Sequence, residues 1–182
     1  GLYNAGDPLL IGKPESDPAL WVGFSFEING LTLLINKPVV YKYTDPVKGE
    51  IYRPLEVLPP VTINPSEKVY VFGDTKPKQI TLRIRANAPN ISGRVEASVT
   101  GGWQVEVKKP EFTLQNKGDE IMVKLTAKPE ENAPPGKLEL SVNIGGASYN
   151  KSIRRIEYDH IPYQFILSDA EVKLVKVDLK KS

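Results

Sequence analysis

Three kinds of side chain in this sequence could carry chemistry: its single histidine, a short acidic turn and a set of aromatic rings. His160 is the only histidine of the 182 residues, and the chain has no cysteine. A catalytic triad or a catalytic zinc site needs several partners around such a histidine, because a nucleophile, base and orienting group, or three metal ligands, must act together. We therefore interpret His160 as a structural residue of a linker between Asp159 and Pro162, and we expect no catalytic residue.

The acidic turn places the carboxylates of Asp45 and Glu50 on either side of Pro46 and Gly49. Clustered oxygen atoms are the ligands that Ca²⁺ prefers, but two carboxylates alone fall far short of the EF-hand pattern. The alternative is a turn in which Asp45 caps backbone amides and Gly49 adopts a positive φ. We expect the turn, with no metal and no cofactor.

The aromatic rings offer a third chemistry, because a flat π face can stack on a sugar ring. The candidate carbohydrate-binding residues are Trp21, Trp103 and Tyr52, and three further tyrosines could extend the platform: Tyr41, Tyr43 and Tyr70. Trp103 also has a structural interpretation, since a tryptophan between a Gly-Gly pair and an alternating strand is typical of core packing. Exposed rings on one sheet would favour glycan binding, and buried rings would favour a structural module.

The elements that would position these residues are all strands. Sixteen prolines and fourteen glycines leave few windows that could hold a helix. Short alternating segments recur between turn residues instead, most clearly in Gln79–Ala86. Asn29-Gly30 between two such segments predicts a hairpin. The predicted fold class is all-β, with an immunoglobulin-like β-sandwich and two β modules, because about seven strands in roughly a hundred residues suit such a sandwich.

Prolines indicate where the modules meet. Pro59-Pro60 stiffens the chain and predicts a boundary near residue 60. We predict a lead-in at Gly1–Ala19 within an N-terminal β module over 1–60, an immunoglobulin-like sandwich over 61–157, and a linker with a terminal strand over 158–182. The N-terminal module has few strands for a sandwich. It closes either with the terminal strand, Glu171–Leu179, or with protein outside this chain.

Charge and composition narrow the classes of partner. The 24 basic and 22 acidic residues give a net charge of +2 and are interspersed, whereas a nucleic-acid partner calls for a concentrated basic face.

No stretch approaches the roughly 18 consecutive apolar residues of a membrane span. The first residues lack the pattern of a signal peptide. Cysteine-free β-sandwiches are common among exported bacterial proteins, but cytosolic proteins can lack cysteine too, so composition leaves the compartment open. We expect a secreted, periplasmic or cell-envelope location.

Two stretches resemble known bacterial families. The region from Gly101 to Val142, with a Gly-Trp strand start and the run Pro129-Glu130-Glu131-Asn132-Ala133-Pro134-Pro135-Gly136, resembles immunoglobulin-like modules associated with galactosidases and carbohydrate-binding modules. The segments 45–55, 158–162 and 170–176 look like the region that follows the catalytic domain in large PIG-L (LmbE-like) deacetylases.

The second resemblance implies an accessory domain of a hydrolase rather than the enzyme itself. In that family a zinc-dependent de-N-acetylase domain carries its ligands in a His-Pro-Asp-Asp motif and a later histidine, and this chain has neither. The resemblance implies that the partner is the catalytic domain of the same polypeptide, acting on N-acetylated sugars. The alternatives are a carbohydrate-binding module and a cell-surface adhesin domain.

Overall fold

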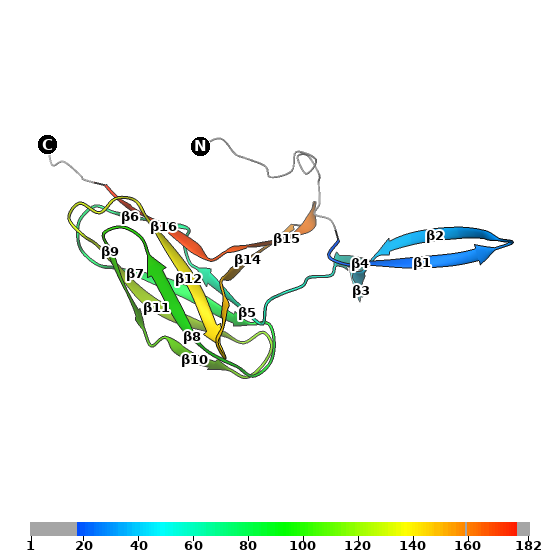
Figure 1. Ribbon diagram of the computed structural model, residues 1–182, viewed down its shortest axis with the longest axis horizontal. Coiled ribbons are helices and arrows are strands. Elements are labelled where there is room, and N and C mark those ends of the chain that lie inside the picture. Colours follow the sequence, from blue (N-terminus) through cyan, green and yellow to red (C-terminus); the bar gives the residue numbers. More distant parts are fainter. Residues whose placement is uncertain (1–17, 159, 178–182) are drawn as a thin grey trace. The chain divides into compact units, whose positions relative to one another are not determined.

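The computed structural model of the chain describes residues 18–158 and 160–177. Within these ranges the regular structure is entirely β-strand, as Figure 1 shows, and no helix is present. The prediction of an all-β protein is therefore confirmed. Most of the predicted lead-in, Asp159 of the linker and the end of the predicted terminal strand lie outside the described residues.

The chain forms two compact units. The first unit contains Gly1–Val57 and Arg155–Phe165, and the second contains Leu58–Arg154 and Ile166–Ser182. Strands β14 (Lys151–Tyr158) and β15 (Ile161–Asp169) pair with each other and contribute residues to both units. The three-part division at residues 60 and 157 stays a prediction.

The second unit is built from two sheets. The first has the order β5-β7-β11-β9. Its strands are β5 (Val61–Pro65), β7 (Lys78–Ala86), β11 (Glu120–Pro129) and β9 (Trp103–Lys108). The second has the order β10-β8-β12-β16-β6, and β13 also pairs with β12. Its strands are β10 (Glu111–Leu114), β8 (Ile91–Val99), β12 (Gly136–Ile144), β16 (Glu171–Lys176), β6 (Val69–Phe72) and β13 (Ala147–Tyr149).

The two sheets share one apolar core, and strand alternation creates it. In β7, Ile80, Leu82 and Ile84 are completely buried, while Arg83 between them is exposed, as expected for a strand with one face on the core. Buried residues of both sheets join these in a single cluster, among them Ile63, Phe72, Trp103, Leu125, Leu138, Leu140, Val172 and Leu174. The core therefore lies wholly within the second unit.

The terminal strand pairs differently from either prediction. Strand β16 lies between β12, with which it is antiparallel, and β6, with which it is parallel. Val172 and Leu174 are buried in the core of the second unit, and Lys173 between them is exposed. The predicted closure of the N-terminal module by this strand is wrong, because its apolar row completes the second unit's core.

The first unit contains two hairpins, β1 (Trp21–Ile28) with β2 (Leu31–Pro38) and β3 (Val40–Asp45) with β4 (Gly49–Pro54). Asn29 and Gly30 both have positive φ, 51° and 78°, which is the backbone of a type I′ turn. The predicted Asn-Gly hairpin is therefore confirmed.

Candidate docking surface

The three candidate carbohydrate-binding residues belong to different units. Trp103 belongs to the second unit, whereas Trp21 and Tyr52 belong to the first. Trp103 is only 7% exposed, packs edge-on against Phe72 with ring centroids 4.9 Å apart, and donates its Nε1 proton to the Pro134 carbonyl at 2.8 Å. A buried indole with a satisfied N–H is a core residue. The prediction that Trp103 binds carbohydrate is therefore corrected in favour of its structural interpretation.

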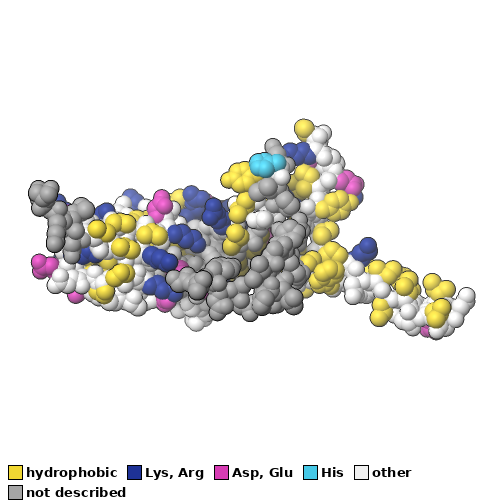
Figure 2. Space-filling view, turned by 90° about the horizontal axis from the view of Figure 1, so that it is seen from above, with side chains coloured by type: hydrophobic (Ala, Val, Ile, Leu, Met, Phe, Trp, Pro, Cys, Tyr) yellow, Lys and Arg dark blue, Asp and Glu magenta, His cyan; other side chains and the backbone are white. Residues whose placement is uncertain are grey.

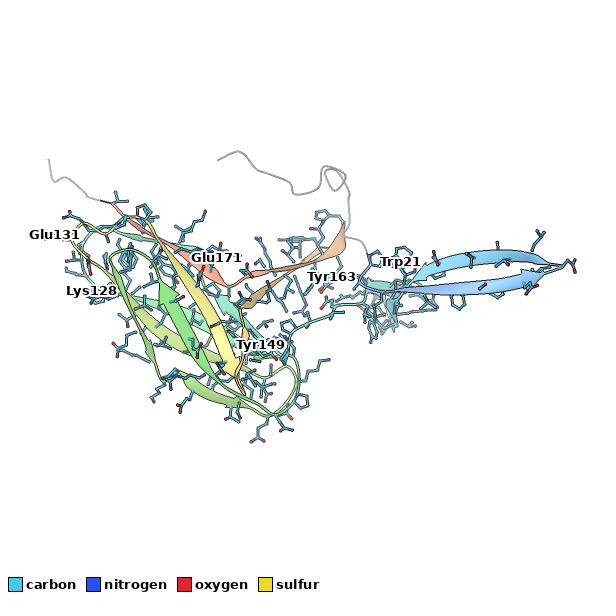
Figure 3. All side chains as sticks on the ribbon, viewed as in Figure 1. Trp21, Lys128, Glu131, Tyr149, Tyr163 and Glu171 are labelled. Atoms are coloured by element: carbon cyan, nitrogen blue, oxygen red, sulfur yellow. The ribbon has the colours of Figure 1, made fainter. Side chains whose placement is uncertain are left out.

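Trp21 and Tyr52 remain accessible. Trp21 begins β1 and is 55% exposed, and Figure 3 shows it at the end of the hairpin away from the turn. Tyr52 in β4 is 56% exposed, but the Nζ of Lys42 lies 5.5 Å from the centre of its ring. This cation–π contact occupies one face of the Tyr52 ring. Only the other face is open for stacking.

The acidic turn and the histidine have structural contacts. The Oδ1 of Asp45 accepts hydrogen bonds from the amides of Val47 and Lys48, both at 2.8 Å, and Gly49 has φ 79°. These amides lower the pKa of the Asp45 carboxyl, first through Lys48 and then through Val47. The capping interpretation is thus confirmed. His160 is exposed and lies against Tyr158, with ring centroids 6.1 Å apart. Over residues 18–158 and 160–177, no three potential ligand side chains gather into a metal site.

One face of the β1–β2 hairpin is almost wholly apolar, and the other mixes polar residues with Trp21, Leu34 and Pro38, as the register shows. The cross-strand pairs are Phe24↔Ile35, Phe26↔Leu33 and Ile28↔Leu31, and between them lie Gly23↔Asn36, Ser25↔Leu34 and Glu27↔Thr32. Because alternate pairs project to opposite sides of a strand pair, the first set shares one side. We call this side the apolar face, and it consists of Val22, Phe24, Phe26, Ile28, Leu31, Leu33 and Ile35.

The apolar face is uncovered. Its seven residues are between 37% and 76% exposed, and Figure 2 shows hydrophobic side chains at the surface along this hairpin. The rings of Phe24 and Phe26 stack on each other at 6.3 Å. A contiguous apolar patch of this kind marks a contact site, because isolated exposed apolar residues are ordinary but gathered ones are not. The sheet also has only two strands, and such a hairpin is marginally stable alone in water.

The rest of the first unit is held by polar and aromatic contacts. Arg53 pairs with Glu157 and lies 4.7 Å from the ring centre of Tyr163. Glu56 accepts hydrogen bonds from the Tyr163 hydroxyl and from Arg155 Nη2, the latter at 3.1 Å. Burial raises the pKa of Tyr163, and Glu56 raises it further. We call these five residues the polar cluster. It joins the segment after β4 to β14 and β15.

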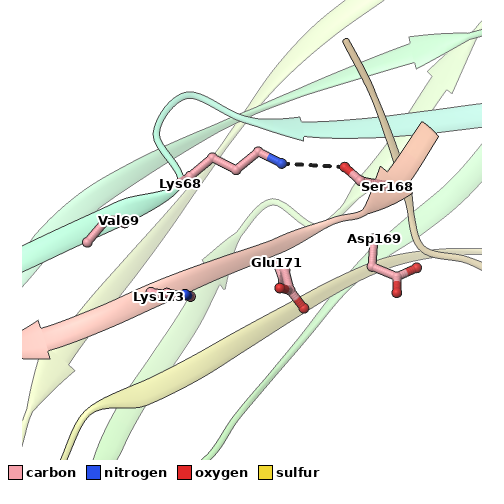
Figure 4. A pocket seen from close by; sticks show the side chains of 6 residues that line it. All are labelled: Lys68, Val69, Ser168, Asp169, Glu171 and Lys173. Carbon is pink, nitrogen blue, oxygen red and sulfur yellow. Dashed lines mark hydrogen bonds between the residues drawn. The ribbon is translucent and has the colours of Figure 1, made fainter. Parts of the chain in front are cut away.

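Two neighbouring hollows of the second unit are lined largely by charged and polar residues. One, of about 330 Å³, is lined by Lys68, Val69, Ser168, Asp169, Glu171 and Lys173. Figure 4 shows Lys68 Nζ directed at Ser168 Oγ, 3.4 Å away. A second, of about 250 Å³, lies beside it, where Lys137 bridges Glu139 and Glu171. Charges of both signs pair with one another at these hollows. This is typical of a solvated sheet face rather than of a specific ligand-binding site.

Comparison of the chain with protein-family models and with curated proteins found no match. In the described residues no helix has the length and apolar character to span a membrane.

The apolar face was missed by inspection of the sequence. The hairpin at Asn29-Gly30 is predicted from the sequence, but the exposure of its apolar side is not. The signal that would have found it is the hairpin register itself, since Asn29-Gly30 fixes which residues of the two strands are opposite.

Proposed function

We propose that this chain is a non-catalytic accessory β region of a larger exported bacterial deacetylase of the PIG-L (LmbE-like) family, and that it supports its neighbours in the polypeptide by packing against them. The observation that carries the proposal is the uncovered apolar face of the β1–β2 hairpin. A face of this composition suits contact with another protein surface. The resemblance of segments 45–55, 158–162 and 170–176 supplies the family.

We also propose that the second unit is an immunoglobulin-like sandwich. The sheet orders β5-β7-β11-β9 and β10-β8-β12-β16-β6 support this assignment. If β5, β7, β8, β9, β11, β12 and β16 are taken as strands A, B, C, D, E, F and G, the first sheet follows the immunoglobulin order A-B-E-D and the second contains C-F-G. The additional strands β10 and β6 extend the second sheet at its two edges.

The proposal is tested by sequencing the source gene outward from both ends of the chain. We expect an upstream His-Pro-Asp-Asp motif followed by a further histidine, and zinc-dependent release of acetate from N-acetylated sugars by the whole gene product. An open reading frame without the motif would contradict the deacetylase assignment. The β region would then be assayed as a free-standing module.

The second candidate is a carbohydrate-binding module, and the exposure of Trp21 and Tyr52 favours it. It predicts a saturable change in Trp21 fluorescence when N-acetylglucosamine oligomers are added, and loss of binding in Trp21→Ala. The accessory proposal predicts no saturable change. Replacing Trp103 is unsuitable as a control because it removes core packing. Tyr158→Ala serves instead, because Tyr158 is an exposed aromatic residue of the first unit that is not one of the candidate binding residues.

A further inference from the structure

We propose that Asn29 is a site of spontaneous covalent modification, in which the backbone nitrogen of Gly30 attacks the side-chain carbonyl carbon of Asn29. A bond forms between Gly30 N and Asn29 Cγ, and the bond from Cγ to Nδ2 breaks. The amide group leaves as ammonia, taking up the proton that Gly30 N has lost. Water then opens the resulting succinimide at either carbonyl carbon and leaves aspartate or isoaspartate at position 29. The reaction does not depend on what the rest of the polypeptide does.

The residue after Asn29 determines whether the ring can close. A side chain at that position crowds the attacking nitrogen, and glycine has none. Asn29-Gly30 is the only Asn-Gly pair in the sequence. A Cβ built at Gly30 would meet no atom within 4 Å. Within the described ranges, no backbone hydrogen bond outside the strand ladders holds the Gly30 amide. The attacking nitrogen is therefore unhindered.

The turn is also open to the reagents. Asn29 and Gly30 are both exposed, and they connect Ile28 to Leu31 where β1 ends and β2 begins (Figure 1). Hydroxide removes the proton of the Gly30 amide before ring closure, and water opens the ring afterwards. Both steps therefore require the solvent access that this turn has.

The closed turn restrains the reaction. Gly30 N reaches Asn29 Cγ only by rotation about the Cα–C bond of Asn29, and the pairing of Ile28 with Leu31 fixes that bond in the type I′ turn. The sheet that holds the turn has only two strands, and such a hairpin is marginally stable alone in water. Local opening therefore releases the Asn29 backbone and sets the rate.

The two products differ in their effect on the hairpin. Aspartate leaves the backbone unchanged, and Asp-Gly favours the same type I′ turn as Asn-Gly. Isoaspartate carries the chain through its side chain and so lengthens the backbone by one carbon atom. Because Asn29 and Gly30 alone separate the paired residues Ile28 and Leu31, the longer turn disturbs the register of β1 and β2.

Incubation of the chain at mildly alkaline pH, followed by peptide mass spectrometry, tests the proposal. Asn90 is the matched internal control, because it is also exposed and has a positive φ, 55°. We expect conversion at Asn29 to be at least about tenfold faster than at Asn90, since Ile91 is branched at Cβ and lies in strand β8. Fragmentation should identify both aspartate and isoaspartate at position 29. Equal rates at Asn29 and Asn90, or aspartate as the sole product, would overturn the proposal.

Two truncations test whether opening of the hairpin sets the rate. Phe26→Ala removes the stack on Phe24 and should raise the rate at Asn29 roughly two- to tenfold, because loss of an aromatic pair favours the open hairpin. Tyr41→Ala truncates an exposed aromatic residue of the β3–β4 hairpin and should leave the rate unchanged. An unchanged rate in Phe26→Ala would show that the closed turn does not restrain the reaction.

Discussion

Strands β7 and β1 share a pattern of alternating residues but lie in opposite environments. In β7 the apolar positions Ile80, Leu82 and Ile84 are fully buried, and in β1 the apolar positions Phe24 and Phe26 are nearly half exposed. Local sequence therefore specifies the strand and its apolar side in both cases. It does not supply the second layer. In the second unit that layer is the β10-β8-β12-β16-β6 sheet, and in the hairpin it is absent from the described residues.

The two units accordingly depend on different interactions. The second unit is stabilised by burial of apolar side chains, which contributes roughly 1.5–3 kcal/mol for each large side chain. The first unit has no comparable cluster among its described residues, and its contacts centre on the polar cluster of Arg53, Glu56, Arg155, Glu157 and Tyr163. We therefore expect the second unit to respond to changes of volume and the first to changes of charge.

The largest difference should appear when one phenylalanine is truncated in each unit. Phe72 is fully buried against Trp103, so Phe72→Ala should cost the second unit about 3–5 kcal/mol of unfolding free energy, through lost burial and the cavity left behind. Phe24→Ala should leave the second unit's transition unchanged in the 182-residue chain. Urea denaturation followed by Trp103 fluorescence, in a Trp21→Phe background, measures both.

That comparison would fail if Phe72→Ala and Phe24→Ala lowered the unfolding free energy of the second unit by the same amount. An equal loss on Phe24→Ala would mean that Phe24 is buried in solution and that the hairpin shares in the cooperative unfolding of the second unit. The Trp21→Phe background alone provides the reference, since Trp21 is exposed and lies in the first unit.

A glycine in each unit gives a smaller contrast. A Cβ added at Gly136 would lie 2.6 Å from Trp103 Cδ1 and 3.0 Å from the Thr100 carbonyl oxygen, so Gly136→Ala should cost about 1–3 kcal/mol by overpacking. A Cβ at Gly23 would meet only the Asn36 Oδ1 atom, at 3.2 Å, at the end of a side chain that can move. Gly23→Ala should therefore be close to neutral. Thermal unfolding followed by circular dichroism compares the two variants with the unchanged protein. If Gly136→Ala were as stable as the unchanged protein, the Trp103 ring would be able to shift away from the added methyl group.

Features that depend on neighbouring residues could be predicted from the sequence. Asn29-Gly30 requires positive φ at both positions, so its hairpin was predictable. Asp45 followed by a turn glycine predicted the backbone cap for the same reason. In Gln79–Ala86 alternation alone identified the buried row. Each of these is set by local sterics and hydrogen bonds.

Features that depend on distant residues could not be predicted. The Gly-Gly pair before Trp103 favours core packing, but nothing local to Trp103 shows that Phe72 lies beside its ring and Gly136 against it. The place of β16 depends on β12 and β6, which lie about 30 and 100 residues earlier. The apolar side of the β1–β2 hairpin follows from its register, but the exposure of that side does not, because exposure depends on residues distant in the sequence.

The smallest expected effect concerns the polar cluster of the first unit and its response to alkaline pH. Burial and Glu56 raise the pKa of Tyr163 above its usual value of about 10. Above about pH 10 the unfolded chain releases this proton while the folded chain keeps it, so stability should fall as pH rises towards the folded pKa. Tyrosinate absorbance should therefore contain a component from Tyr163 that titrates above the usual value of about 10.

Two conservative variants assign that late titration and connect it to the contrast between the units. Tyr163→Phe should remove it, and Tyr158→Phe, at an exposed residue whose ring lies against His160, is the matched control. Tyr163→Phe should also reduce the alkaline loss of stability of the first unit and leave the second unit's transition unchanged. If Tyr163→Phe altered neither the titration nor the alkaline stability, the polar cluster would not be formed in solution.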